Sequence, residues 1–413
     1  MRKWFIFMLL VIAVLSFSQI LNYVPANFKV VRYVKNLSEF YSEIKTLPSG
    51  QFLTETLGLE MMIQGILESQ LLNQGIEPSD FYDLLSHEFL YVQLDNKNFC
   101  LIVGPSKSTK RLKENIKSIV SELFGVGDII VAEDNDYLFL GTSEAVNSTL
   151  KGGGDVPEEL KKLDFFGYAK VQVGDYSFTI VNKKEIAGDH LTLETEIVPE
   201  DESSKSFLEK LGKSKEVPPD YYVYGELTII FNTEDYKGLR DIISDVGFSF
   251  PSNGSGLPFQ PPDMDVEKIL DTLSESLDTP MFFSANISGA LMDLIAGSTP
   301  TNLEIIARAK LKDSKSIVEK VLKEAGIRYE KSGDKFILEN NFHLVVSDGA
   351  ITLKSKTFSP KTLKEHPDGK DVFFLFLDMK TVMEALVGEG EEAYILAKAW
   401  YENGRMLLYV NVK

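Results

Sequence analysis

The residues that could bind phosphate occur in this sequence only in an incomplete pattern. The segment Gly104-Pro105-Ser106-Lys107-Ser108-Thr109-Lys110 follows an apolar run and precedes a charged amphipathic stretch, as a phosphate-binding loop would. Such a loop needs a second glycine before its lysine and free backbone amides around the phosphate, and Pro105 removes one amide. We interpret the segment as a turn that enters a helix.

Serine nucleophiles are also poorly supported. The spacing Ser-x-x-Lys occurs at Ser148–Lys151 and Ser332–Lys335, but the second pair lies in a predicted hairpin turn and no Lys-Thr-Gly motif follows. Enzymes with this spacing place the serine at the start of a buried helix, so that the lysine one turn later can accept its proton. The G-x-S-x-G elbow of α/β-hydrolases is absent from the sequence. We assign no catalytic residue.

Metal and thiol chemistry lacks the necessary ligands as well. The four histidines, His87, His190, His343 and His366, form no HExxH motif and no i, i+4 pair, so no helix-borne zinc site is encoded. The single cysteine, Cys100, cannot form an internal disulfide, and its apolar neighbours predict a buried thiol. We therefore assign no metal site and no cofactor.

Carboxylates are abundant, and they could serve as the catalytic groups of a hydrolase. General acid–base catalysis needs two carboxylates at a defined separation across a cleft, which pairs such as Asp263 and Asp265 do not establish by themselves. The nearby segment 247–262 holds four prolines and three glycines, and a loop of this length often acts as a lid or binding loop. The alternative to a binding protein is an extracytoplasmic hydrolase with a scattered acidic site near loop 247–262. A surface insertion is the other interpretation of this loop.

The apolar residues of one expected helix are better candidates for a binding site. Periodicity predicts a long helix from Gln51 to Gln74, in which apolar residues cover more than one narrow stripe. This helix is either packed between a sheet and a second layer, or it contributes to a binding groove. In the second case Met61, Met62 and Ile66 line the groove, which takes a lipid-like ligand or a partner helix.

The elements expected around this helix alternate between strands and helices, and their order repeats. The strand expected at Cys100–Val103 and its following helix match Glu304–Ala307 and the helix after it. In the same way, Asp164–Val173 matches Asp371–Leu377. This repetition indicates an internal duplication, although any α+β chain can show similar echoes by chance.

We therefore predict an α+β fold with two similar halves, residues 20–215 and 220–413. Each half is expected to be an antiparallel sheet with helices packed on one face, because strand–helix–strand–strand order is typical of ferredoxin-like and related split units. The boundary falls at 213–219, where charged residues and two adjacent prolines disfavour a helix.

Residues 1–19 have the pattern of a signal peptide. Two basic residues precede an unbroken apolar run from Trp4 to Leu15, and Ser16 and Ser18 provide the small residues of a cleavage site. An uncleaved N-terminal anchor is the alternative, because the apolar stretch approaches the length that spans a bilayer. The sequence thus predicts a periplasmic or cell-surface protein, with a membrane partner only through this N-terminus.

The composition is that of a folded, acidic protein. With 43 Lys and Arg against 61 Asp and Glu, the net charge is −18 at pH 7, and this charge repels the phosphates of nucleic acids. Hydrophobic residues make up 44% and charged residues 25%, close to the averages of globular proteins. Nucleic acid is therefore excluded as an expected partner.

After the leader, Tyr23-Val24-Pro25-Ala26 opens the first strand–helix unit. In this element and in its layout the chain resembles uncharacterised bacterial extracytoplasmic proteins, families of unknown function with repeated strand–helix units. The resemblance implies an extracytoplasmic location and transfers no functional residue. The function expected is that of a non-enzymatic envelope protein, binding an unknown protein or apolar ligand between its duplicated halves. A subunit that assembles only with a partner is a third option.

Overall fold

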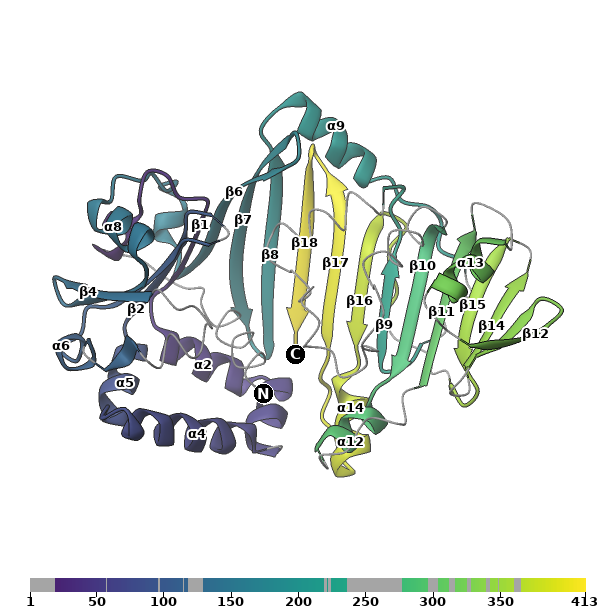
Figure 1. Ribbon diagram of the computed structural model, residues 1–413, viewed down its shortest axis with the longest axis horizontal. Helices are drawn as coiled ribbons and strands as arrows, with labels where there is room; N and C mark the ends of the chain where they lie inside the picture. Colours follow the sequence, from purple (N-terminus) through teal and green to yellow (C-terminus); the bar gives the residue numbers. More distant parts are fainter. Residues whose placement is uncertain are drawn as a thin grey trace. The chain divides into compact units, whose positions relative to one another are not determined.

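The computed structural model divides into two compact units. Unit 1 comprises Met1–Gln172 and Ser177–Ile197, and unit 2 comprises Val173–Tyr176 and Val198–Lys413. The structure describes the following residues (Figure 1): 19–56, 58–95, 97–113, 115–117, 129–218, 221, 224–235, 277–295, 304–311, 316–324, 328–338, 342–347, 349–359 and 365–413. Residues 1–18 of the expected leader and the loop 247–262 lie outside them.

Unit 1 is built on an antiparallel sheet. Its described strands are β1 (Val30–Val34), β2 (Glu88–Gln93), β3 (Phe99–Gly104), β4 (Ile129–Asp134), β5 (Tyr137–Thr142), β6 (Phe165–Val173), β7 (Tyr176–Ala187) and β8 (His190–Pro199). The pairings give the order β4-β5-β3-β2-β1-β6. Because side chains alternate across a strand, Val31 and Tyr33 of β1 enter one core, whereas Arg32 and Val34 lie on the other face.

Helices cover both faces of this sheet. Those described in unit 1 are α2 (Leu37–Thr46), α3 (Pro48–Gln51), α4 (Leu59–Asn73), α5 (Pro78–Leu85), α6 (Thr109–Leu112) and α8 (Ser143–Lys151), with short 3-10 turns η1 (Gln19–Tyr23) and η3 (Leu160–Lys162) and a π-helical turn η2 (Phe52–Thr56). Helix α8 buries Val146 in the core that contains Tyr33. Helix α2 packs on the opposite face, where the Phe40 and Phe165 rings lie 6.4 Å apart.

The single helix expected from Gln51 to Gln74 is broken into shorter pieces. Gly58 has φ 64°, a left-handed conformation that glycine adopts at little cost and that interrupts a right-handed helix. The break leaves α3 and η2 on one side of Gly58 and α4 on the other. The expected helix was therefore too long, although its second half is α4.

Unit 2 is built on a second set of antiparallel pairs. Its described strands are β9 (Leu227–Phe231), β10 (Leu277–Asn286), β11 (Glu304–Leu311), β12 (Tyr329–Ser332), β13 (Lys335–Leu338), β14 (Phe342–Ser347), β15 (Ala350–Ser355), β16 (Asp371–Leu377), β17 (Ile395–Glu402) and β18 (Arg405–Val412). Their order is β12-β13-β14-β15-β11-β10-β9-β16-β17-β18. The described helices are α9 (Glu202–Leu211), α12 (Ser288–Ile295), α13 (Ser316–Glu324) and α14 (Met379–Val387).

The predicted fold class, α+β with two similar halves and helices packed on one face, is wrong. The described residues contain 18 strands in antiparallel sheet, and more of them lie in strands than in helices. In unit 1, moreover, helices pack on both faces, because both faces of strands such as β5 are buried. The alternation of apolar and polar residues predicted many of the strands. Amphipathic stretches, however, were interpreted too often as helices that form a layer on the sheet.

The strand order of unit 1 has a counterpart in unit 2. The order β4-β5-β3-β2-β1-β6 corresponds to β14-β15-β11-β10-β9-β16, and among the described strands β12 and β13 pair with each other next to β14. The segments matched in the sequence, Cys100–Val103 and Glu304–Ala307, lie in β3 and β11, which occupy equivalent places. A duplication of the chain at residues 20–215 and 220–413 stays a prediction.

Candidate functional site

The three candidate binding residues lie on the outward surface of α4. Met61 is 76% exposed, Met62 46% and Ile66 49%, and Leu72 on the same helix is 57% exposed. Gly65 and Ser69 are also exposed. Because residues three or four positions apart share one side of a helix, these six residues form one continuous surface, which we call the α4 outer face.

Polar residues of α4 contact the neighbouring helices and hold α4 in place. Lys45 of α2 lies 2.6 Å from the Glu60 carboxylate, and the Tyr82 hydroxyl of α5 donates to Glu68 at 3.0 Å. Gln64 donates to Glu68 at 2.8 Å, one turn away on the same side. In Figure 1, α4 runs along the edge of unit 1, with α2 between it and the strands.

Two apolar residues complete the inward side. Leu71 is fully buried and Leu67 nearly so, and these residues lie one turn apart. Burial and the acceptor Glu68 raise the pKa of Tyr82, which therefore stays protonated and donates at neutral pH. Helix α4 thus differs from an ordinary amphipathic helix, because it buries Leu67 and Leu71 on one side and exposes other long apolar side chains on the outer face.

The alternative of a helix packed between two layers does not fit this arrangement. The outer-face side chains remain exposed, whereas a second layer would bury them. The structure brings Met62 and Ile66 together one turn apart and places Met61 beside them. Whether a ligand or a partner covers these residues stays a prediction.

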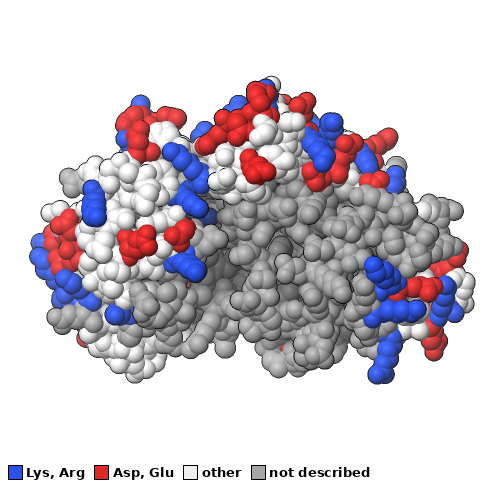
Figure 2. Space-filling view, turned by 45° about the horizontal axis from the view of Figure 1, so that its top comes forward, with Lys and Arg blue, Asp and Glu red and all other residues white. Residues whose placement is uncertain are grey.

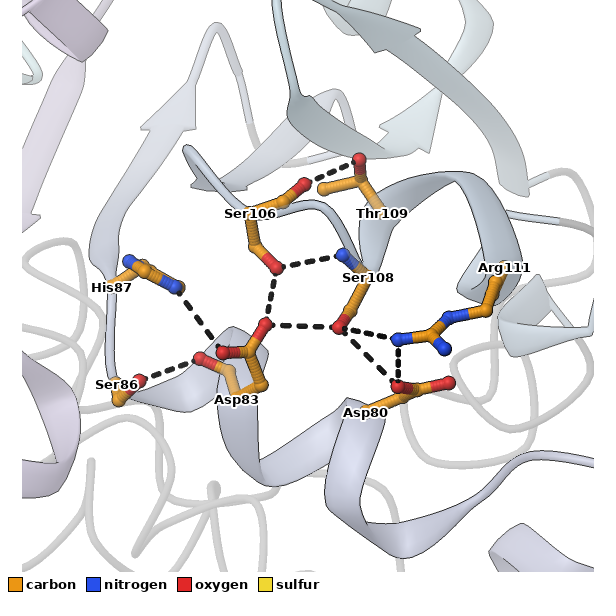
Figure 3. Close-up of polar contacts among 8 residues, drawn as sticks. All are labelled: Asp80, Asp83, Ser86, His87, Ser106, Ser108, Thr109 and Arg111. Carbon is orange, nitrogen blue, oxygen red and sulfur yellow. Dashed lines mark hydrogen bonds and ion pairs between the residues drawn. The ribbon is translucent and has the colours of Figure 1, made fainter.

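A polar cluster at the start of α6 involves the segment that resembled a phosphate loop. Ser106 and Ser108 donate their hydroxyls to the Asp83 carboxylate of α5 at 2.5 and 2.9 Å, and the amide of Ser108 donates to the Ser106 hydroxyl (Figure 3). Arg111 of α6 pairs with Asp80 of α5. The hydroxyls that a phosphate would need are therefore bonded to carboxylates of the protein itself.

The same cluster contains a serine, an aspartate and a histidine, but not in catalytic order. In a triad the histidine lies between the other two and accepts the serine proton. Here Asp83 lies in the middle, bonded to Ser106 and 3.6 Å from the Nε2 atom of His87 (Figure 3). The hydrogen bond from Ser106 lowers the pKa of Asp83, so this carboxylate is a weak base. The cluster ties α5 to the β3–α6 turn.

The remaining histidines and the cysteine occupy structural positions. His190 and His343 belong to β8 and β14, and the His366 ring lies 3.2 Å from the Tyr224 hydroxyl. Cys100 is fully buried beside the Thr149 hydroxyl, and burial raises the pKa of its thiol to about 12. Within the described ranges, no group of three His, Cys, Asp or Glu side chains could hold a metal ion.

One buried carboxylate has the raised pKa expected of a general acid. Asp371 at the start of β16 is 3% exposed, and burial raises its pKa to about 6. Its carboxylate accepts the Asp368 amide at 2.6 Å, and its backbone carbonyl accepts the Asn232 side chain. These contacts close a turn, so Asp371 has a structural explanation that the sequence did not reveal.

Replacing Asp371 by Asn is expected to stabilise the protein at pH 8 and to have little effect at pH 4. The folded-state pKa lies above the unfolded value, so this group favours folding at low pH and loses that contribution as the pH rises through about 6. A difference of about two pKa units corresponds to roughly 3 kcal/mol at pH 8. Urea unfolding at both pH values measures this difference in the free energy of unfolding. The exposed turn residue Asp175, changed to Asn, is the control, and equal effects of the two variants would contradict the burial argument.

The comparisons with known proteins give no match. No family model matches this chain, and no curated protein or solved structure is significantly similar to it. Among the described helices, none combines the length and the apolar character needed to cross a bilayer.

Proposed function

We propose that this chain is an exported envelope protein of non-enzymatic type that binds a protein partner through the α4 outer face. The observation that carries the proposal is the exposure of Met61, Met62 and Ile66 on a helix whose Glu60 and Glu68 contact α2 and α5 of unit 1. A contiguous apolar surface of this kind is typical of an interaction site. The sequence suggested binding between two halves, and the proposal instead places it on α4.

The size of the face indicates weak or exchangeable binding. Four large apolar side chains, each contributing roughly 1.5 kcal/mol on burial, give about 6 kcal/mol. Association itself costs about 4 kcal/mol or more, so this face alone supports only modest affinity. Methionine at two of these positions suits such a surface, because its flexible side chain adapts to different partner shapes.

The occupant proposed is an amphipathic helix whose apolar stripe is flanked by Lys or Arg. Helix α4 contains no basic residue, its polar side carries Glu60 and Glu68, and the whole chain has a net charge of −18. Gly65 and Ser69 lie in the face, and a Cβ added at Gly65 would meet no atom within 4 Å. A partner backbone can therefore approach closely at this point.

A membrane surface fits the same face less well. Helices that lie in a lipid interface carry Lys and Arg on their polar side to attract anionic headgroups. Helix α4 carries glutamates there instead, and these are bonded to α2 and α5. The charges therefore favour a basic protein helix over a lipid surface.

Nucleic acid is not proposed as a partner. On the surface drawn in Figure 2, basic and acidic side chains of the described residues are intermixed, without an extended basic area among them. On α9, for example, Lys205 and Lys210 pair with Glu202 and Asp235. A surface that binds phosphate backbones needs an excess of positive charge, which the composition also lacks.

Export is proposed from the signal-peptide pattern of residues 1–19. Ile20 and Val24 are fully buried in the core of unit 1, directly after the expected cleavage position at Ser18. Cleavage there would retain these residues, so the mature protein would keep this core. The proposed location is therefore the periplasm or the cell surface.

The proposal is tested with synthetic helical peptides as probes. A fluorescent peptide with a leucine stripe flanked by lysines is expected to bind the purified protein, while the same peptide with glutamates in place of the lysines binds at least tenfold more weakly. Changing Ile66 to Glu should weaken binding of the lysine peptide at least tenfold, because the substitution places a charge in the centre of the α4 outer face. Fluorescence anisotropy at 150 mM salt measures both, and this salt limits nonspecific attraction between charges.

The matched control is Met292→Glu on α12 of unit 2. Met292 is 48% exposed, almost the same as Ile66, so both substitutions introduce a carboxylate on an exposed helical position. The control variant should bind the lysine peptide as the unmodified protein does. A site on α4 would be contradicted if the Ile66 variant bound the lysine peptide as strongly as the unmodified protein, or if both variants lost the same amount of affinity.

A further inference from the structure

Arg32 lies on the face of the unit 1 sheet that is covered by α2. It stands between Val31 and Tyr33, which both enter the core shared with α8, so its side chain leaves the opposite face of β1. Phe165 lies on that opposite face and contacts Phe40 of α2. Arg32 is half-buried there.

Two more polar side chains stand in the same row across the sheet. Tyr91 of β2 is directly opposite Arg32, and Gly167 of β6 is opposite it on the other side. A Cβ added at Gly167 would lie 2.8 Å from the Nδ2 atom of Asn182, so the β7 side chain lies over this glycine. Arg32 is therefore flanked by a phenol and a carboxamide, and only a glycine separates it from the carboxamide.

Among the described residues, no partner compensates the charge of Arg32. It makes no hydrogen bond or ion pair with any residue that the structure describes, and burial lowers the pKa of its guanidinium. Two residues beyond Asn182 on the same face, Lys184 shows the usual solution, since it lies 2.5 Å from the Glu43 carboxylate. A buried charge without such a partner is costly, so an arginine in this place needs an explanation.

The neighbours of Arg32 also have unused hydrogen-bonding capacity. The buried Oδ1 atom of Asn182 has no hydrogen-bond partner within the described part of the chain, so the amide can present either end. The Tyr91 hydroxyl makes only a long contact, 3.5 Å, to Gln93. All three side chains remain partly accessible to solvent.

We propose that Arg32, Tyr91 and Asn182 form a binding site for a small oxyanion, a carboxylate or phosphate group. The planar guanidinium presents parallel N–H donors that match two oxygens of such a group. The phenol and the carboxamide add one donor each from either side, and the bound anion neutralises the buried charge. This site is independent of the α4 outer face, because α4 contributes no residue to it.

The test is the thermal stability of the purified protein in different anions at constant ionic strength and pH 7. Inorganic phosphate and acetate, each at 20 mM, are compared with chloride. Millimolar affinity would raise the unfolding temperature by about 5 °C in the anion that binds. The two arms distinguish a phosphate site from a carboxylate site, and a response to neither overturns the proposal.

Variants locate the effect at Arg32. Arg32→Met should unfold at a higher temperature in chloride, because it removes an unpaired buried charge, and it should lose the response to the anion. Tyr91→Phe should reduce the response and retain the fold. Lys170→Met, which removes an exposed positive charge on β6, should respond as the unmodified protein does. An anion response that persists in Arg32→Met, or one that disappears in Lys170→Met, would overturn the assignment.

Discussion

Replacing Gly152 by Ala is expected to destabilise unit 1 by about 3 kcal/mol or more. Gly152 has φ 61° and ψ −145°, a conformation that side chains rarely adopt, and an added Cβ would lie 2.1 Å from the backbone oxygen of Asn22. The same contact region includes a hydrogen bond of 2.7 Å from the Gly154 amide to the Val24 carbonyl. The substitution would therefore separate the first residues after the leader from α8. Urea unfolding followed by circular dichroism measures the loss.

The control for this prediction is Gly174→Ala. Gly174 also has a left-handed φ, 58°, but an added Cβ would meet no atom within 4 Å. Only the backbone preference is then lost, about 1 kcal/mol. Similar losses in the two variants would show that the contact between Gly152 and Asn22 is not what makes the first position sensitive.

Replacing Glu226 by Ala is expected to destabilise unit 2 by about 3 kcal/mol. The Glu226 carboxylate is 4% exposed and accepts three hydrogen bonds at the start of α12, from the Ile287 amide at 2.6 Å and from the amide and hydroxyl of Ser288 at 2.7 Å each. Its carbonyl also accepts the amide of Asp378, which caps α14. The alanine would leave buried donors without an acceptor. Thermal unfolding measures the change.

Two further variants separate this explanation from a general effect of helix capping. Glu226→Gln keeps one side-chain oxygen and should lose less stability than the alanine. Asp201→Ala removes the exposed cap of α9, whose carboxylate accepts the Ser204 amide, and should cost only about 1 kcal/mol. Equal losses at Glu226 and Asp201 would contradict the special role of the buried carboxylate.

Much of the strand content could be predicted from the sequence, because its signal is local. Cys100 stands in an unbroken apolar run, and the structure places it fully buried in β3. The turn between β4 and β5 contains Asn135 and Asp136, residue types that favour turns, and both have positive φ. Short-range alternation and turn residues determine such features, so they are visible without a structure.

The roles of polar residues could not be predicted, because they depend on partners far along the chain. Nothing near Glu226 in the sequence indicates that it accepts the amides of residues 287 and 288. Arg32 is also unremarkable by itself, and only the register of β1 places it opposite Tyr91 and Gly167. Sequence reasoning therefore missed both the helix cap and the proposed anion site.

The candidate residues on α4 were found from the pattern of apolar residues, which does not show the orientation of the helix. Met61, Met62 and Ile66 stood out because the apolar residues exceed one stripe, and this excess is what the structure exposes. Which side of the helix faces the protein could not be inferred, because Glu60 pairs with Lys45 of another helix. Apolar periodicity shows that a helix has two apolar sides, but not which side meets the protein.

The central claim is that the α4 outer face binds a protein helix outside the cytoplasm. Its most direct test is photo-crosslinking in intact cells, with the photoreactive residue benzoylphenylalanine at Ile66 and, as the control, at the equally exposed Met292. We predict a single protein adduct at Ile66 whose linked peptide is an amphipathic helix with flanking Lys or Arg, and no such adduct at Met292. No adduct at Ile66, a lipid adduct, a second copy of this chain or the same adducts at both positions would contradict it.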